Sequence, residues 1–288
     1  MVPHSVSRIA IRLRQIMLYK YSFRAVYLVF SVNSSSRRIS KPPKSATGTS
    51  LQSSSTKMTS SAKHKTQQPF PLQRRTMKIG AVVVAAGKSE RMGRNKLLIK
   101  LKGKTLLEHV LDGISSSCVR QIIVVVGHKP WELNQVLDNP KYNLKVVTNK
   151  NYERGMLSSF KKGLGSILDT DAVFLVLGDQ LIVDPHFLNQ MANVIQANRQ
   201  TAKIVSPLYR KVRGHPVLLS NALYDQIMSL GDDKTLHDLI SNQEKSVVAL
   251  KAKAWTAIDI DRPEDVVVAR RYVSGTNQKN TEEKSKAV

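Results

Sequence analysis

Four cations and two glycines lie within ten residues, in the stretch GKSERMGRNK from Gly87 to Lys96. Glycine has no Cβ atom, so Gly87 and Gly93 allow backbone N–H groups to approach a ligand closely. The four cations repel one another, and a bound anion would offset that repulsion. Ser89 adds a hydroxyl donor. These residue types at this spacing predict that the stretch, called the glycine loop from here on, binds a polyphosphate.

The spacing of the glycine loop differs from two common phosphate-binding motifs. It matches neither GxxxxGK[ST] nor GxGxxG, so the P-loop and dinucleotide interpretations do not apply. The alternative is a purely structural turn between a strand and a helix. Such a turn has no use for four mutually repelling cations, which favours the binding interpretation.

A buried strand must position this loop. Ile79 to Ala85 is a continuous run of small and β-branched apolar residues, which is typical of a strand covered on both faces of a parallel sheet. Further apolar runs alternate with helical patterns, and these runs lie at 121–126, 144–147, 172–177, 204–207, 247–250 and 256–260. The alternation predicts an α/β fold with a three-layer, Rossmann-like, mainly parallel sheet and helices on both faces. Ligands of such folds gather at the carboxyl ends of the strands.

Carboxylates follow two of the predicted strands. Asp179 stands shortly after the run at 172–177, and Mg²⁺ prefers one or two carboxylates together with phosphate oxygens. Stabilisation of a turn is the alternative role for Asp179. Asp259 and Asp261 share one face of the last run, so either could be a second metal ligand. Asp261 could instead cap the helix that follows.

The sequence AAGKSERMGRNKLL, residues 85–98, closely resembles the signature AAGxSxRMGxxKLL of the molybdenum cofactor cytidylyltransferase family, a group of MobA-like nucleotidyltransferases. The resemblance implies a nucleotidyltransferase fold whose loop wraps a triphosphate. It also implies that Arg91 and Lys96 are catalytic and stabilise charge at the α-phosphate. An Ala-Ala-Gly start goes with pyrimidine nucleotides in this family, which favours CTP. The nucleotide-binding residues that the resemblance implies are Ala85, Ala86, Gly87, Ser89, Arg91, Gly93, Lys96, Ser159 and Asp179.

Two later segments resemble elements of the same family that contact the acceptor. NYERGMLSSFKKGL, which begins at residue 151, resembles the NxxxxxGMxxS element, and this implies that Gly155 and Met156 bind the acceptor. On the residues alone the segment is an ordinary serine-rich helix start. RGHPV resembles the GHP element, which implies that Gly214 and His215 bind the acceptor without transferring a proton. A lone histidine in a loop is otherwise more often structural.

Two carboxylate segments resemble the metal-binding elements of the family. The resemblance of GDQ, residues 178–180, implies that Asp179 is a ligand of Mg²⁺ or Mn²⁺. The resemblance of DID, residues 259–261, implies the same role for Asp261. The sequence departs from the family pattern at Leu181, which replaces a frequent proline, and at Arg262, which replaces threonine. The loop that contains residues 233 and 234 also departs from the family pattern, so the resemblance does not extend to substrate contacts of that loop.

The reaction that the resemblance implies is transfer of CMP from CTP to a phosphate-bearing acceptor of the molybdopterin type, with release of pyrophosphate and hand-over of the product to a molybdoenzyme or its chaperone. A related transferase for a sugar phosphate or polyol phosphate is the alternative within this class. A basic nucleic-acid-binding protein is the alternative outside it. Aromatic residues that could stack on bases make up 6% of the chain and are absent from the glycine loop, so we predict no nucleic-acid partner.

The net charge of +24 is concentrated at the N-terminus. Residues 1–76 contain 14 Lys and Arg with no Asp or Glu, whereas residues 77–288 contain 31 basic and 21 acidic residues. This Ser-rich leader shows no sustained periodicity, so we expect a disordered extension, an organellar transit peptide, a secretory signal or sequence upstream of the true start. Met77 directly precedes the first predicted strand. The predicted domains are therefore the extension 1–76, a nucleotidyltransferase domain at 77–273 and a polar, disordered tail at 274–288.

Cysteine content and hydropathy suggest the compartment. Cys118 is the single cysteine, so the chain offers neither an intramolecular disulfide nor a cysteine metal cluster. The apolar stretch around residues 27–30 is far shorter than the roughly 20 residues of a membrane helix, and we predict no membrane association. We expect a cytoplasmic enzyme, with import into an organelle through residues 1–76 as the alternative.

Overall fold

The computed structural model describes the backbone of residues 76–285 and the side chains of residues 76–274. The predictions made for residues 1–75 lie outside the described residues. Among the described helices, none combines the length and the apolar character that a membrane span requires.

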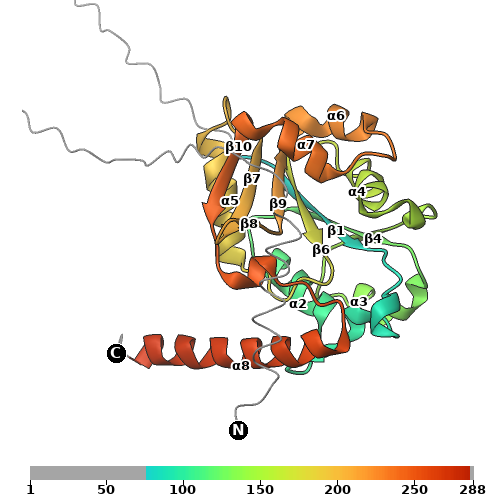
Figure 1. Cartoon of the computed structure of the whole chain (residues 1–288), viewed down its shortest axis with the longest axis vertical. Coiled ribbons are helices and arrows are strands. Elements are labelled where there is room, and N and C mark those ends of the chain that lie inside the picture. The colour runs from blue at the N-terminus through green and yellow to red at the C-terminus, as the bar shows by residue number, and fades with distance from the viewer. Residues whose placement is uncertain (1–75, 286–288) are drawn as a thin grey trace, which may run out of the picture. The chain divides into compact units, whose positions relative to one another are not determined.

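One sheet of eight strands runs through the described part of the chain, in the order β10-β7-β9-β6-β1-β4-β5, with β8 paired to β7 (Figure 1). Its strands are β1 (Ile79–Ala85), β4 (Gln121–Val126), β5 (Lys145–Thr148), β6 (Ala172–Leu177), β7 (Ile204–Tyr209), β8 (Val212–Arg213), β9 (Val217–Ser220) and β10 (Val247–Lys251). β1 pairs in parallel with both β4 and β6 and is therefore central. β9 runs antiparallel to its neighbours β6 and β7. A separate two-stranded hairpin joins β2 (Lys100–Leu101) and β3 (Lys104–Thr105).

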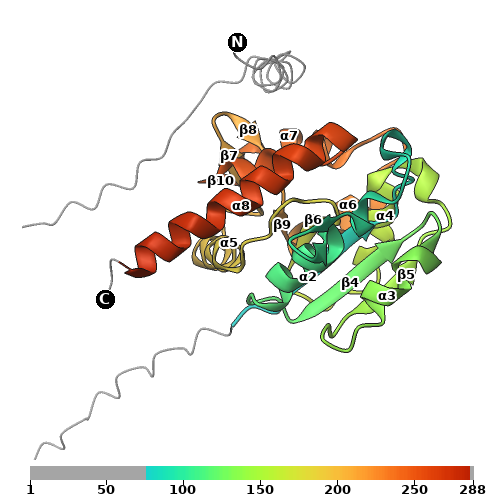
Figure 2. The ribbon, with the colours of Figure 1, turned by 90° about the horizontal axis from the view of Figure 1, so that it is seen from below.

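Helices cover both faces of this sheet, as the two views show (Figures 1 and 2). The helices are α2 (Leu106–Ser115), α3 (Asn134–Leu137), α4 (Met156–Leu164), α5 (Pro185–Ala197), α6 (Tyr224–Ser229), α7 (Leu236–Asn242) and α8 (Pro263–Ser285). Short 3₁₀ turns complete the elements: η1 (Glu90–Met92), η2 (Lys96–Leu98), η3 (Pro130–Leu133), η4 (Tyr152–Arg154), η5 (Asn221–Leu223), η6 (Glu244–Ser246) and η7 (Ala254–Ala257). The predicted three-layer α/β fold is confirmed.

Alternation along β1 explains the two main cores. Ala81 and Val83 pack with side chains of α2, α3 and α5, whereas Val82 packs with side chains of α4, α6 and α7. Successive residues of a strand point to opposite faces, so a strand in the middle layer must be apolar throughout. A third, smaller core lies outside the sheet, where Met92 of η1 packs with Leu101 of β2 and Val266 of α8.

Helix starts follow the capping signals in the sequence. The Thr105 hydroxyl accepts a hydrogen bond from the Glu108 backbone N–H at 3.2 Å, and the Glu108 carboxylate accepts one from the Thr105 N–H at 2.6 Å. This capping box fixes the first turn of α2. Asp184 caps α5 by accepting from the His186 N–H at 2.9 Å, and Pro185 takes the first helical position.

The C-terminal third differs from the prediction in two places. β9 was not predicted from the sequence, and it lies between β6 and β7 in the sheet. The strand predicted at 256–260 is wrong: the chain forms η7 there, followed by an isolated bridge between Asp259 and Gln180. The backbone of α8 continues to Ser285, and the polar, disordered tail predicted at 274–288 stays a prediction.

Candidate active site

The glycine loop leaves the end of β1 and folds back on itself. Ser89 and Gly93 both have left-handed backbones, with φ of 56° and 69°. Gly93 tolerates this conformation, whereas Ser89 is strained by it, as residues at functional sites often are. The Ser89 hydroxyl accepts a hydrogen bond from the Lys96 N–H at 3.2 Å, and buried Met92 anchors the loop in the third core. The loop therefore presents its cations outward from a fixed base.

Lys96 joins the glycine loop to two carboxylates that come from much later in the chain. Its ammonium donates to Asp261 Oδ1 at 2.9 Å and also contacts Asp179 Oδ2. Arg91 Nη2 lies 3.1 Å from the other Asp261 oxygen, Oδ2. Asp179 follows β6, and Asp261 stands just before α8. The structure thus brings the predicted catalytic cations and the predicted metal ligands into one cluster.

The electrostatics of Lys96 reflect two opposing effects. Partial burial lowers the pKa of the ammonium, but the charges and hydrogen bonds of Asp179 and Asp261 outweigh it, so the pKa of Lys96 is raised overall. The Lys96 side chain is 18% exposed and that of Asp179 is 16% exposed. Lys96 therefore stays positively charged at neutral pH and is available to an anionic substrate.

The two carboxylates fit a divalent cation. Oxygens of Asp179 and Asp261 both contact the same nitrogen, so one cation can touch both, and the Lys96 ammonium stands in for it here. Hard oxygen ligands of this kind suit Mg²⁺ and Mn²⁺, which take their remaining ligands from phosphate and water. Within the described residues, no group of three or more His, Cys, Asp or Glu side chains forms a metal cluster.

A cavity of about 420 Å³ adjoins this cluster. It is lined by Gly87, Lys88, Ser89, Glu90, Arg91, Lys96, Tyr152, Glu153 and Asp261. Lys88 Nζ lies 2.7 Å from Glu153 Oε1, so an ion pair connects the glycine loop to η4 across the cavity. Five of the predicted site residues, Gly87, Ser89, Arg91, Lys96 and Asp261, therefore share one cavity wall.

The segment before α4 is organised by a residue that the sequence did not single out. Asn149, which is 5% exposed, donates from Nδ2 to the hydroxyls of Ser158 and Ser159 at 3.0 and 3.1 Å. Gly155 has φ of 98°, a value that disfavours any other residue. Met156 is exposed. The signal for Asn149 was its position directly after β5, where a polar residue follows an apolar run.

Gly214 and His215 do not line either of the two cavities that border the glycine loop, and neither do Gly155 and Met156. A Cβ atom on Gly214 would lie 2.1 Å from the Thr256 carbonyl oxygen, so glycine is required there by packing. The His215 N–H donates to that same oxygen at 3.0 Å. The predicted role of these residues in acceptor binding stays a prediction.

Ala85 and Ala86 are buried at the end of β1. The Ala86 carbonyl accepts a hydrogen bond from the His128 N–H at 3.2 Å, which ties β1 to the turn after β4. Gly127 in that turn lies so close to Tyr152 that a Cβ atom would be 2.6 Å from the Tyr152 Cβ. The carboxyl ends of β1, β4 and β5 are thus drawn together beside the glycine loop.

Comparisons with known proteins find relatives that match most of the described part of this chain. The family model for the MobA-like NTP transferase domain matches residues 81–247. The molybdenum cofactor cytidylyltransferase of Escherichia coli is 28% identical over 195 residues, which are 67% of this chain and 97% of that protein. A probable molybdenum cofactor guanylyltransferase of Natranaerobius thermophilus is 26% identical over 215 residues, 70% of this chain and 99% of that protein.

A solved structure extends the comparison. Rv0371c from Mycobacterium tuberculosis is 25% identical, with a TM-score of 0.59, and the match covers 68% of this chain and 98% of that one. The same protein has been solved in complex with manganese, and that structure matches with 24% identity, a TM-score of 0.57 and coverage of 68% and 99%.

Proposed function

The chain belongs to the family with a MobA-like NTP transferase domain and is a nucleotidyltransferase, and from that premise we propose that it transfers CMP from CTP to a phosphate-bearing acceptor of the molybdopterin type. The reaction releases pyrophosphate. One observation carries this proposal: Lys96, from a glycine loop, contacts two carboxylates that reach it from the end of β6 and the start of α8.

The proposed mechanism depends on alignment and charge. A phosphate oxygen of the acceptor attacks the α-phosphorus of CTP, the bond to the β-phosphate oxygen breaks, and pyrophosphate leaves with the bonding electrons. Lys96 and Arg91 stabilise the negative charge that builds up at the α-phosphate. The acceptor needs no general base, because the second pKa of a phosphate monoester is about 6 and the group is ionised near neutral pH.

Asp179 and Asp261 would hold Mg²⁺ or Mn²⁺, and nucleotidyltransferases generally use such divalent metals. When bound, the metal supplies charge neutralisation on the triphosphate oxygens. The two carboxylates would hold it, and the Lys96 ammonium, which contacts both of them, would stand beside the triphosphate. A structure of Rv0371c in complex with manganese is in keeping with a divalent metal in this class of enzyme.

The choice of CTP rests on the residues at the end of β1. Ala85, Ala86 and Gly87 form the start that goes with pyrimidine nucleotides, and the relative from Escherichia coli is named a cytidylyltransferase. The relative from Natranaerobius thermophilus is named a guanylyltransferase, so GTP is the competing nucleotide. We assign Gly155, Met156, Gly214 and His215 to the acceptor side and Ser159 to the nucleotide side.

We propose that residues 77–273 carry this activity in the cytoplasm, and that the product passes to a molybdoenzyme or its chaperone. A pyrophosphate-release assay tests the reaction: the full chain is incubated with Mg²⁺ and CTP, GTP, ATP or UTP in turn, each with molybdenum-loaded pterin, a sugar phosphate or a polyol phosphate. We expect release with CTP and the pterin, and its loss with EDTA. Equal turnover of CTP and GTP would overturn the assignment of the nucleotide. Turnover with a sugar phosphate and not with the pterin would overturn the assignment of the acceptor.

A further inference from the structure

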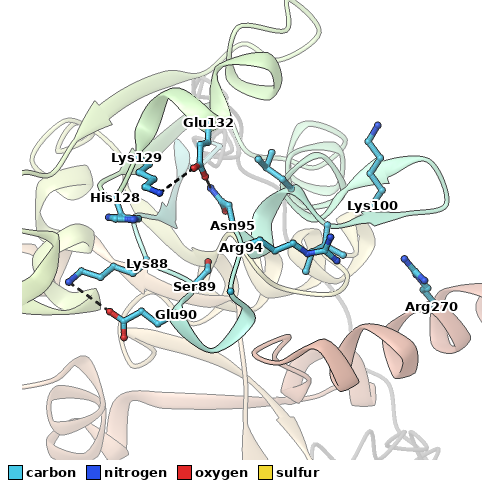
Figure 3. A pocket seen from close by; sticks show the side chains of 14 residues that line it. Lys88, Ser89, Glu90, Arg94, Asn95, Lys100, His128, Lys129, Glu132 and Arg270 are labelled. Atoms are coloured by element: carbon cyan, nitrogen blue, oxygen red, sulfur yellow. Dashed lines mark hydrogen bonds and ion pairs between the residues drawn. The ribbon is translucent and has the colours of Figure 1, made fainter.

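A second and larger cavity, of about 810 Å³, lies beside the glycine loop (Figure 3). Its walls come from four parts of the chain: the glycine loop, the segment from η2 to β2, the turn between β4 and η3, and α8. It shares Gly87, Lys88, Ser89 and Glu90 with the smaller cavity. Neither Asp179 nor Asp261 lines it. The two candidate metal ligands therefore lie outside the lining of this cavity.

The charge on the wall of this cavity is unbalanced. Its cations are Lys88, Arg94, Lys100, Lys129 and Arg270, and its acids are Glu90 and Glu132. Two of the cations pair with acids: Lys88 with Glu153 at 2.7 Å and with Glu90 at 3.9 Å, and Lys129 with Glu132 at 3.9 Å. Within the described residues, Arg94, Lys100 and Arg270 form no ion pair or side-chain hydrogen bond, although Lys100 interacts at longer range with the Glu108 carboxylate. In Figure 3, Lys100 and Arg270 lie at the end of the cavity away from Lys88 and His128, with Arg94 between.

These three cations stand on rigid supports. Lys100 lies between Ile99 and Leu101, and both of these are in the third core. Arg270 directly follows Ala269, which is fully buried in that core. Met92, two residues before Arg94, packs there as well. A single apolar cluster thus fixes the backbone under all three charges, so the folded chain holds them at the wall of this cavity.

We propose that this cavity is a second anion site, built by Arg94, Lys100 and Arg270, for a diphosphate or triphosphate group. Three cations that line one hollow and form no ion pair raise the positive potential there, and a polyanion offsets their repulsion. The leaving pyrophosphate is one source of such a group, and this source rests on the proposed function. A second nucleotide that regulates the enzyme is the other source, and it has the same phosphate chemistry.

Direct binding tests the site without turnover. Inorganic pyrophosphate is titrated into the full chain by calorimetry, in EDTA and about 150 mM salt, where the Debye length is about 8 Å and distant charges are screened. The test variant is Lys100→Gln with Arg270→Gln. The matched control is Lys102→Gln with Arg271→Gln, which removes the same charge from the hairpin and from α8 at positions that do not line the cavity. Thermal unfolding checks that both variants fold.

The expected result is a dissociation constant at least tenfold weaker in the test variant and within twofold of the unmodified chain in the control. Lys96→Ala, which the proposed function expects to be inactive, should keep pyrophosphate binding within twofold. Equal weakening in test and control, no weakening in the test variant, or loss of binding in Lys96→Ala would each overturn the proposal. Titration with CDP identifies the source, because a regulatory nucleotide predicts tighter binding of CDP than of pyrophosphate and the leaving group predicts the reverse.

Discussion

Lys96 Nζ and Asp261 Oδ1 lie 2.9 Å apart, although 165 residues separate them in the sequence. The contact joins the loop after the first strand of the sheet to the entrance of the last helix. The third core supports both ends, since Met92 precedes Lys96 and Ile260 precedes Asp261 within it. The candidate active site is therefore assembled only when the C-terminal segment has packed against the glycine loop.

Replacement of Lys96 tests the charge that this contact places at the α-phosphate. We expect Lys96→Ala to lower kcat by about 10²–10³-fold, the usual effect of removing one group that stabilises transition-state charge. The measurement is pyrophosphate release with CTP, Mg²⁺ and molybdenum-loaded pterin. Lys102→Ala, at the exposed turn of the hairpin, is the matched control and should keep full activity. Full activity of Lys96→Ala would remove Lys96 from the mechanism.

Substitutions can distinguish the two candidate metal ligands from the neighbouring carboxylate of Asp259. Asp179→Ala and Asp261→Asn should each abolish transfer at 1 mM Mg²⁺, on the order of a hundredfold loss or more, because a metal held by two carboxylates loses half of its protein ligands. Asp259→Asn removes the other acid of the DID segment. We expect it to retain activity, because Asp261 and not Asp259 contacts Lys96.

The Mg²⁺ dependence of transfer distinguishes a ligand from a structural role. A ligand variant with residual activity should need at least tenfold more Mg²⁺ for its half-maximal rate. A variant that merely disturbs the fold would lose activity at every Mg²⁺ concentration and unfold at lower temperature. If Asp259→Asn behaved as the ligand variant and Asp261→Asn did not, the assignment would be reversed.

Much of the fold was predictable because its strands are buried on both faces. β1, β4 and β6 begin and end at the residues that the apolar runs indicate, since a middle-layer strand has no polar face to blur its limits. β9 was missed because the basic residues and the Gly-His-Pro sequence ahead of it are typical of a loop. The strand predicted at 256–260 was wrong because buried Trp255 and Thr256 imitate a strand while forming a 3₁₀ turn.

The site was predictable in its residue types and not in its contacts. The resemblance of the glycine loop to the family signature indicated Arg91 and Lys96, but only the folded chain shows that both contact Asp261. Asn149 is marked only by its position after an apolar run, and Lys100 and Arg270 of the larger cavity belong to no local motif. Their roles arise from the packing of β5 on α4 and of α8 on the hairpin, which a periodicity argument does not reach.

The close packing of α4 on the sheet gives a prediction for two nearby glycines. A Cβ atom on Gly163 would lie 2.4 Å from Val82 Cγ1 and 2.8 Å from Val125 Cγ2, whereas one on Gly165 would meet nothing closer than 3.6 Å. We expect Gly163→Ala to lower the free energy of unfolding by about 1–3 kcal/mol, as overpacked cores do. Gly165 has φ of −60°, so Gly165→Ala should be neutral or stabilise by up to about 1 kcal/mol. Urea unfolding of both variants is the measurement, and equal effects would contradict the packing.

Asp112 anchors a polar cluster that makes stability depend on pH. Its carboxylate accepts a hydrogen bond from the Tyr142 hydroxyl at 2.8 Å and pairs with Lys104 at 2.5 Å and with Lys141. Burial alone would raise the pKa of Asp112, but these three partners lower it to about 2, against an ordinary value of 3.8. A carboxyl whose pKa is lower in the folded state stabilises the protein above its unfolded pKa, and this stabilisation is lost as the pH falls toward the folded pKa.

We therefore expect Asp112→Asn to lower the free energy of unfolding by about 1–2 kcal/mol at pH 7, a value reduced for the partial exposure of the group. The difference from the unmodified chain should hold down to about pH 4 and shrink between pH 4 and pH 2, because the protonated acid and the amide are both uncharged. Urea unfolding at a series of pH values is the measurement. Asp138→Asn, an exposed acid whose side chain has no ion pair within the described residues, should differ by less than about 0.5 kcal/mol at every pH. If the loss of unfolding free energy in Asp112→Asn stayed constant down to pH 2.5, the shape of the Asp112 side chain and not its charge would explain its role.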